Sequence, residues 1–289
     1  MIVVERIPDV RAAVREARAA GQTIRLVPTM GALHDGHRSL IRAARPNGGF
    51  VVVSIFVNPT QFGPAEDLAS YPRPIERDLD LCKAEGVDLV FHPTADEMYP
   101  AAPKTTVHVA DLAAGLCGAH RPGHFDGVCT VVAKLFGIVG PDAAYFGEKD
   151  AQQLAILRRM VADLDLPVRI RACPLVRDAD GLATSSRNAY LSKVDRGRAL
   201  ALPHALLEAG GRIRNGERRA EHLRRQVTDA LGAADGVEVQ YVAVVDPDTL
   251  APLETVGDRV LVAAAVRVGT TRLIDNVLLR NLEPGTRGG

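Results

Sequence analysis

Short apolar, β-branched runs alternate with amphipathic helical patterns between Thr23 and Arg177. The run Phe50–Val57 is almost continuously apolar, which is typical of a strand buried on both faces of a parallel sheet. The strands predicted in this part of the chain are 24–28, 50–57, 87–91, 143–146 and 167–172. Helices are predicted between them, at 38–45, 74–86, 128–139 and 150–163. This alternation predicts βαβ units and therefore a doubly wound parallel sheet of the α/β class.

The pattern changes after residue 175. Two helical stretches, at 196–214 and 217–231, are followed by three strand-like runs, at 237–245, 260–268 and 271–279. Helices followed by strands predict a smaller C-terminal α+β domain. We therefore expect two domains, residues 1–175 and 176–289. The last seven residues, 283–289, include Pro and Gly and are expected to fray.

Composition and charge narrow the class of protein. The chain has 289 residues, of which 47% are hydrophobic and 24% charged, as in ordinary globular proteins. Its 35 basic and 35 acidic residues give a formal net charge of zero, so the basic excess that binds long nucleic acids is absent. No apolar stretch approaches the about 20 residues of a membrane span, and no signal peptide is visible. Four scattered cysteines without a CxxC pair favour reduced thiols in a cytoplasmic protein.

The most informative segment is Pro28–His37, which follows the first predicted strand and opens a helix, where an open α/β sheet binds ligands. It matches neither GxGxxG nor GxxxxGK[ST]. His34 and His37 are three residues apart and share one side of the first helical turn. Gly36 lets a nucleotide approach the backbone, and the helix start favours a phosphate. We interpret the segment as a nucleotide-phosphate site; metal chelation by the two histidines and a purely structural turn are the alternatives.

Two further polar clusters carry groups that bind phosphate. The segment Gly147–Gln153 follows a predicted strand, and within it Lys149 can reach a phosphate while Asp150 can cap the next helix. The segment Thr184–Asn188 brings hydroxyls and a guanidinium together, which are donors that a polyphosphate needs. Each cluster alone is typical of a surface lysine or an ordinary turn. Together with the histidine pair, they suggest one ATP site whose phosphates are held from two domains.

The combination of HxGH, a later lysine and a Ser-Ser-Arg run resembles the signature of the nucleotidylyltransferase and class I synthetase superfamily. The fuller phrases are similar to those of the pantoate–β-alanine ligase family. In family order, these phrases are Pro28–His34, Ser54–Phe62, Arg121–Val128, Phe146–Asp150 and Asp180–Asn188. The chain departs from the family pattern at Thr184, where many members carry methionine, and at Ala151, where an aromatic residue is common. These departures concern local adenine or loop contacts rather than the reaction.

The resemblance implies an ATP-dependent ligase that forms an amide bond in pantothenate biosynthesis. The carboxylate of pantoate would attack the α-phosphate of Mg-ATP, giving pantoyl adenylate and pyrophosphate. The amine of β-alanine would then attack the acyl carbon, giving pantothenate and AMP. ATP with Mg²⁺ is thus a substrate, and no tightly bound organic cofactor is expected.

The same resemblance implies the roles of the two domains and the partners. Residues 1–175 would form a Rossmann-like domain that binds the nucleotide and pantoate, and residues 176–289 would form a smaller lid. The partners would be the three small-molecule substrates and a second copy of the chain in a homodimer, with no membrane and no nucleic acid.

Site residues also follow from the resemblance. The catalytic residues that the resemblance implies are His34, His37, Lys149 and Arg187. Their side chains can donate hydrogen bonds to the oxygens on which negative charge develops, on the α-phosphate and on the leaving pyrophosphate. The residues expected to contact ATP are Met30, His34, His37, Gly147, Lys149, Asp150, Ser185, Ser186 and Arg187. Those expected to contact pantoate are Asn58, Gln61, His124 and Gln153, with Tyr71 and Arg121 nearby. Asp78 is a candidate ligand of Mg²⁺ through water.

Two other functions stay open at this point. A nucleotidylyltransferase acting on a phosphate ester would release pyrophosphate but would not generate AMP. A nucleotide-binding sensor without turnover would not need a lysine and a Ser-Ser-Arg run in addition to the histidines. An aminoacyl-tRNA synthetase is disfavoured by the zero net charge and the small C-terminal half, and the arginine-rich stretch 212–225 is typical of a solvated helix face.

Overall fold

The computed structural model describes every residue except 47, 65, 102 and 283–289, so the C-terminal tail expected to fray lies outside the described residues. Contacts divide the chain into two compact units. Unit 1 comprises Met1–Glu148 and Ile156–Pro174, and unit 2 comprises Lys149–Ala155 and Leu175–Gly289. The main division follows Pro174, whereas the predicted division followed residue 175. The segment Lys149–Ala155, which the sequence pattern assigned to the first domain, groups with the second.

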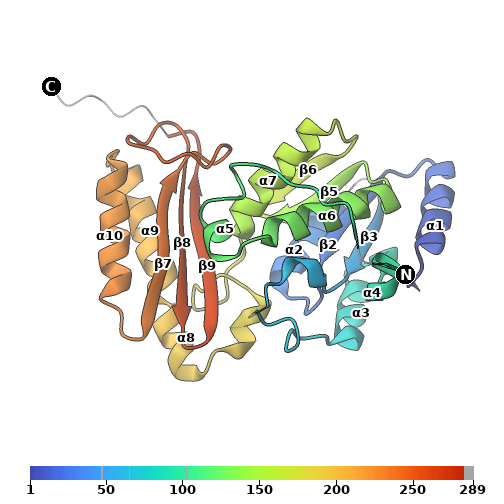
Figure 1. The fold of residues 1–289 in the computed structure, drawn as a ribbon, viewed down its shortest axis with the longest axis horizontal. Helices are drawn as coiled ribbons and strands as arrows, with labels where there is room; N and C mark the ends of the chain where they lie inside the picture. The colour runs from blue at the N-terminus through green and yellow to red at the C-terminus, as the bar shows by residue number, and fades with distance from the viewer. Residues whose placement is uncertain (47, 65, 102, 283–289) are drawn as a thin grey trace. The chain divides into compact units, whose positions relative to one another are not determined.

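A six-stranded sheet forms the centre of unit 1, in the order β1-β4-β3-β2-β5-β6. Figure 1 labels four of its strands, β2, β3, β5 and β6. All five strand pairs are parallel, as the alternating pattern predicted. The strands are β1 (Ile2–Val4), β2 (Ile24–Thr29), β3 (Phe50–Ile55), β4 (Leu89–Phe91), β5 (Ala143–Gly147) and β6 (Arg169–Cys173). Because β2 lies between β3 and β5, the strand order reverses beside β2, and the carboxyl ends of β2 and β5 flank the position where such sheets bind ligands.

Helices cover this sheet because its strands are apolar on both faces. Val27 and Val53 belong to a buried cluster with residues of α2 and α3, whereas Leu26 and Val52, one position away, face the other side and are also fully buried. The helix α1 packs against α6, and both contact β2. The helices that begin in unit 1 are α1 (Ile7–Ala19), α2 (Asp35–Ala44), α3 (Ile75–Ala84), α4 (Ala95–Met98), α5 (Cys117–His120) and α6 (His124–Val139). The helix α7 (Ala151–Asp163) begins in unit 2 and continues into unit 1.

Several predicted elements differ from the structure at their ends. The strand β1 and the helix α1 were not predicted. The strand β1 gives no clear local signal, because it has only three residues and pairs with a strand far along the chain. The helix α2 begins at Asp35 rather than Arg38. The single helix predicted at 196–214 is two helices, α8 (Lys193–Ala199) and α9 (Ala201–Arg214). Pro203 explains the break, since it has no N–H to donate to the carbonyl of Ala199.

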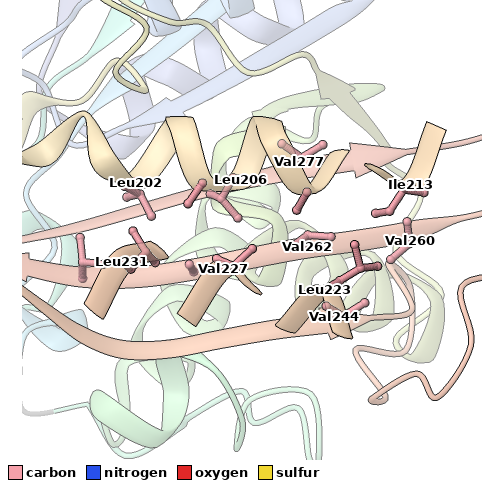
Figure 2. Packing of buried hydrophobic residues seen from close by; sticks show 14 of the residues in the cluster. Leu202, Leu206, Ile213, Leu223, Val227, Leu231, Val244, Val260, Val262 and Val277 are labelled. Atoms are coloured by element: carbon pink, nitrogen blue, oxygen red, sulfur yellow. The ribbon is translucent and has the colours of Figure 1, made fainter. Parts of the chain in front are cut away.

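Unit 2 has an antiparallel sheet of β7 (Val237–Val245), β8 (Val260–Val268) and β9 (Thr271–Leu279), in that order. The bounds of these strands are those that the sequence predicted. The helices α9 and α10 (Ala220–Gly232) lie along one face of this sheet (Figure 1). Figure 2 shows their apolar side chains directed at those of the strands, in a buried cluster that includes Leu206, Leu223 and Val262.

The central strand of this sheet is buried on both faces. Val262 packs with the helices, whereas Leu261 and Ala263 belong to a second cluster on the other face that also includes Ala151. Burying one such aliphatic side chain contributes about 1.5–3 kcal/mol to folding. Among the described residues, no helix has both the length and the apolar character required to cross a membrane.

Candidate active site

A tight turn connects β2 to α2 at the carboxyl end of the strand. Gly31 (φ +79°) and Ala32 (φ +48°) both have left-handed backbone conformations, which favour glycine and are strained for alanine. The Thr29 hydroxyl donates to the carbonyl of Ser54 (2.7 Å) and accepts the N–H of Gly31 (3.2 Å). Leu33, which follows the turn, is buried in the core. The turn is therefore fixed from both of its ends.

Asp78 of α3 also holds this turn. Its two carboxylate oxygens accept the N–H groups of Ala32 and Leu33, each at 2.8 Å. The residue is 1% exposed. Burial raises the pKa of Asp78, although the two backbone hydrogen bonds oppose that effect. The carboxylate thus stabilises the strained turn immediately before His34.

His34 and His37 are stacked at the start of α2. His34 occupies the N-cap position and forms a capping box with His37. The ring centroids are 4.0 Å apart, at an interplanar angle of 34°. The backbone N–H of His34 donates to Nδ1 of His37 (3.3 Å), so the neutral His37 ring carries its proton on Nε2, where it can donate to an anion. A Cβ on Gly36 would lie 2.9 Å from the His34 ring, so the stacked arrangement requires glycine there.

A buried amide cluster lies beside this turn, around the short 3₁₀ helix η1 (Pro59–Gln61). Asn58 Nδ2 donates to Gln61 Oε1 (3.1 Å) and to the carbonyl of Gly127 (3.2 Å). Gln61 Nε2 donates to the Met30 sulfur at 3.1 Å. The Tyr99 hydroxyl donates to Asn58 Oδ1 at 2.9 Å, and burial raises the pKa of this tyrosine. The structure therefore brings three of the residues singled out from the sequence together, namely Met30, Asn58 and Gln61.

His124, at the start of α6, joins the same cluster. Its Nδ1 lies 2.8 Å from the carbonyl of Gln61, and its Nε2 lies 2.9 Å from Nη1 of Arg121. Because a guanidinium can only donate, Nε2 accepts and the proton of His124 is on Nδ1, which donates to Gln61. Arg121 also forms an ion pair with Glu66 (2.5 Å). Tyr71 is buried and makes an edge-on ring contact with Phe62.

A cavity of about 420 Å³ adjoins the turn, at the carboxyl ends of β2 and β3. Its lining is mainly apolar and includes Met30, Gly31 and Asp78. Such a cavity, with few polar groups on an apolar wall, is typical of a small-molecule site.

The other predicted phosphate-binding groups belong to unit 2, except Gly147, which ends β5 in unit 1. Lys149 Nζ lies 3.8 Å from Asp150 Oδ2, and the lysine side chain is 21% exposed. Gln153 is half-buried in α7. The amides Gln61 and Gln153 thus come from different units, and the grouping of Gln153 with Gln61 remains a prediction.

The segment Ser185–Arg187 begins the 3₁₀ helix η3 (Ser186–Tyr190). Ser185 is its N-cap, and its hydroxyl accepts the N–H of Arg187 (3.3 Å). All three side chains are half-buried. All three segments singled out from the sequence therefore lead into a helix, and two of them also contain the end of a strand. One segment belongs to unit 1, and the other two belong mainly or wholly to unit 2.

Asp178 holds the segment Thr184–Asn188 through hydrogen bonds, and the sequence analysis did not identify it. Its carboxylate accepts from the Thr184 hydroxyl (2.7 Å), Asn188 Nδ2 (3.2 Å) and Arg196 Nη2 (2.7 Å). Thr184 therefore supplies a hydroxyl donor at a position where methionine could not. Local sequence gives no signal for this role, because a loop aspartate is usually solvated.

The metal prediction rests on Asp78 alone. Among the described residues, no group of three or more His, Cys, Asp or Glu side chains could hold a metal ion. The carboxylate of Asp78 already accepts two backbone N–H groups. These residues do not form a protein cage for Mg²⁺, which commonly binds to the phosphates of its substrate and keeps several waters.

Comparison with known proteins identifies a family. The family described as Pantoate-beta-alanine ligase matches residues 2–278. A curated relative from Thermoanaerobacter sp. (strain X514), named Pantothenate synthetase, is 54% identical over 96% of this chain and 98% of the relative. A crystal structure of pantothenate synthetase from Thermus thermophilus superposes with a TM-score of 0.92, at 45% identity over 98% of this chain and all of that chain.

A ligand complex is also similar to this chain. It is a pantoate-beta-alanine ligase from Francisella tularensis, crystallised with "Beta-gamma ATP and Beta-alanine". It has a TM-score of 0.78 and 34% identity, and the match covers 96% of this chain and 97% of that chain.

Proposed function

This chain belongs to the pantoate–β-alanine ligase family, and from that premise we propose which of its residues bind and activate each substrate. The enzyme joins pantoate to β-alanine through an amide bond, at the expense of ATP. In the first step a pantoate carboxylate oxygen attacks the α-phosphorus, and the bond to the β-phosphate breaks as pyrophosphate leaves. In the second step the β-alanine nitrogen attacks the acyl carbon of pantoyl adenylate, AMP leaves, and the amine loses a proton.

The first step needs stabilisation of negative charge rather than a base, because a carboxylate is already a nucleophile. We assign that stabilisation to His34 and His37, together with Lys149 and Arg187. The neutral His37 ring, with its proton on Nε2, has the donor that an α-phosphate oxygen requires. Backbone N–H groups at the start of α2 add to this, since a helix N-terminus favours anions. Met30, Gly147, Asp150, Ser185 and Ser186 complete the proposed ATP contacts.

The contact between Met30 and Gln61 is the observation that carries this assignment. Met30 begins the turn that leads to His34, and its sulfur accepts a hydrogen bond from the Gln61 amide (3.1 Å). The amide cluster is thereby held next to the phosphate-binding turn, as attack by a bound carboxylate on an α-phosphate demands. We propose that Gln61, Asn58 and His124, together with Gln153, bind pantoate. Neutral amides can bind the carboxylate without the tight ion pair that would weaken it as a nucleophile.

We propose that Mg²⁺ enters with the phosphates of ATP and neutralises part of their charge. Asp78 remains the proposed water-mediated contact, and no step of the reaction depends on it. We also propose that the protein is a cytoplasmic homodimer and that residues 176–289 act as a lid over bound nucleotide; these proposals follow from the family resemblance.

A coupled assay for AMP, run with ATP and pantoate in the presence and absence of β-alanine, tests the reaction. AMP should accumulate in many turnovers only when β-alanine is present. Gln61→Ala should raise the KM for pantoate by about 10- to 100-fold, the cost of leaving buried polar partners unpaired. The KM for ATP should change far less. If the KM for ATP rises as much as the KM for pantoate, Gln61 does not belong to the pantoate site. Release of pyrophosphate without formation of AMP would contradict the ligase reaction.

A further inference from the structure

Two adjacent polar residues, Asp275 and Asn276, lie in the interior of β9. They are only 2% and 6% exposed, within a strand whose other buried residues are mostly apolar. Burying a carboxylate and an amide is costly unless both are hydrogen-bonded. Adjacent strand residues point to opposite faces of a sheet, so the two side chains serve different faces. Their strand neighbours on β8, Ala264 and Ala263, belong to the two clusters on those faces.

Asp275 binds Arg177 through two hydrogen bonds. Arg177 Nη1 lies 2.7 Å from Asp275 Oδ2, and Nη2 lies 3.0 Å from Oδ1. The same guanidinium donates to the carbonyl of Gly181 (3.1 Å). This planar, two-bond geometry fixes orientation as well as position. Asp275 therefore anchors the loop that begins at Arg177.

That loop leads directly into the Ser-Ser-Arg run. Arg177 forms an antiparallel bridge with Ala183, and the N–H of Thr184 donates to the carbonyl of Val176 (3.0 Å). The loop therefore folds back on itself, and its second arm continues into Ser185. An anchor at Arg177 thus sets where Ser185–Arg187 begins.

Asn276 binds the other phosphate-binding segment of unit 2. Its Nδ2 donates to the backbone carbonyl of Lys149 at 3.0 Å, across 127 positions of sequence. Ala151, two residues further on, packs in the cluster on this face of the sheet. The hydrogen bond and this apolar contact together fix the backbone from which the Lys149 side chain extends.

We propose that Asp275 and Asn276 are positioning residues for the first half-reaction. Asn276 sets the backbone of Lys149, and Asp275 sets Ser185–Arg187 through Arg177. This inference rests on the proposed roles of those two segments in binding ATP. One dipeptide in the C-terminal sheet thereby fixes two segments that are far apart in sequence, and both are needed at one triphosphate.

A double-mutant cycle between Asn276 and Lys149 tests the proposal. The measurement is single-turnover release of pyrophosphate from ATP and pantoate. Asn276→Ala should slow release by about 10- to 100-fold, the cost of a small displacement of a catalytic group. Lys149→Ala should slow it by about 10²- to 10³-fold. In the Lys149→Ala background, Asn276→Ala should slow release by less than about threefold, because a residue that acts through Lys149 has nothing left to position.

A matched control comes from the same strand. Arg272 contacts the Gln240 side chain (2.7 Å), and Arg272→Ala should leave pyrophosphate release within about twofold of the wild-type rate. Thermal unfolding of each variant identifies the temperature at which all are folded. If Asn276→Ala fails to fold, Asn276→Asp replaces it, since the aspartate keeps the size but loses the donor. A second double-mutant cycle, Asp275→Asn with Arg187→Ala, tests in the same way whether Asp275 positions the segment Ser185–Arg187.

Each outcome decides the proposal. If the two substitutions slow pyrophosphate release non-additively, the proposal is supported. Additive losses, or normal release in Asn276→Ala, overturn it while leaving the role of Lys149 intact. Wild-type release in Lys149→Ala instead removes Lys149 from the proposed ATP site, and the inference about Asn276 falls with it. If Asp275→Asn does not fold, the Asn276 cycle decides alone, because it leaves the Arg177–Asp275 pair in place.

Discussion

His34 and His37 owe their stacked arrangement to the residues around them. Gly36 leaves the room that the His34 ring occupies, and Asp78 holds the strained turn that precedes it. The two imidazoles then lie at a helix start, where the backbone also favours a phosphate.

Removing either imidazole should impair the first half-reaction. His34→Ala and His37→Ala should each slow pyrophosphate release by about 10²- to 10³-fold, the cost of one transition-state donor. The melting temperature should fall by only a few degrees, because each substitution removes one side of the capping box of α2, which is worth about 0.5–2 kcal/mol. Single-turnover kinetics and thermal unfolding of both variants provide the check. A variant with wild-type release would show that its ring does not touch the reacting phosphates.

Asp178 predicts a pH dependence of stability. Burial would raise the pKa of Asp178, but hydrogen bonds from Arg196, Thr184 and Asn188 outweigh that effect and hold the pKa below its ordinary value of 3.8. A carboxylate with a lowered pKa stabilises the folded state above its unfolded pKa. That contribution disappears as the pH falls through the folded pKa.

Asp178→Asn should therefore unfold at lower urea concentration than the wild type at neutral pH. The difference between the two proteins should shrink as the pH falls below 3.8, since the wild-type carboxylate then also becomes protonated. Urea titrations over a series of pH values measure this. A difference that stays constant down to the lowest pH would mean that the charge of Asp178 does not stabilise the fold.

At the scale of single elements, α6 contains two glycines with opposite surroundings. A Cβ on Gly127 would lie 2.3 Å from the carbonyl oxygen of Thr60 and 2.7 Å from Cα of Gln61. A Cβ on Gly137 would have nothing within 4 Å. The helix therefore approaches η1 closely at Gly127, whose carbonyl also accepts a hydrogen bond from Asn58 of the amide cluster.

Alanine substitutions at these two positions should act in opposite directions. Gly137→Ala should raise the free energy of unfolding by about 0.5–1 kcal/mol, because alanine favours a helix interior over glycine. Gly127→Ala should lower it and also raise the KM for pantoate, because the added methyl displaces the backbone of Thr60 and Gln61. Chemical denaturation and steady-state kinetics test both. A Gly127→Ala variant with normal pantoate KM would separate α6 from the pantoate site.

The whole molecule carries no net charge, which bears on its partners. With 35 basic and 35 acidic residues, it lacks the basic excess that draws proteins to nucleic acids. Many arginines of the C-terminal half are in ion pairs within that half, among them Arg212 with Glu208 and Arg224 with Glu221. The arginine-rich stretch 212–225 spans the end of α9, a loop and the start of α10, and most of its arginine side chains are exposed.

Transfer RNA should accordingly have no effect on the enzyme. At about 0.15 M salt, where only proteins with many phosphate contacts retain polyanions, a filter-binding assay should detect no complex. The rate of AMP formation should be unchanged by added tRNA. Stimulation of AMP formation by tRNA would instead point to an aminoacyl-tRNA synthetase.

Local patterns in the sequence were enough to predict the parallel sheet and the bounds of the three C-terminal strands. They were also enough to single out the segments that carry the proposed chemistry. The physical reason is that alternation, β-branching and turn residues act over a few positions, so each strand or helix start has its own signal. Elements without such a signal were missed: β1 is short and half-exposed, and it forms only by pairing with β4.

Only the tertiary structure decided which distant residues support the site. Asp78 reaches the turn before His34 across 45 positions, and Asn276 reaches Lys149 across 127. The same structure groups Lys149–Ala155 with the C-terminal unit. Nothing in the local sequence marks a buried aspartate or asparagine as a hydrogen-bond partner, because its partners are chosen by packing. The segments proposed to carry the chemistry could therefore be singled out from the sequence, whereas the groups that hold these segments in place became visible only in the fold.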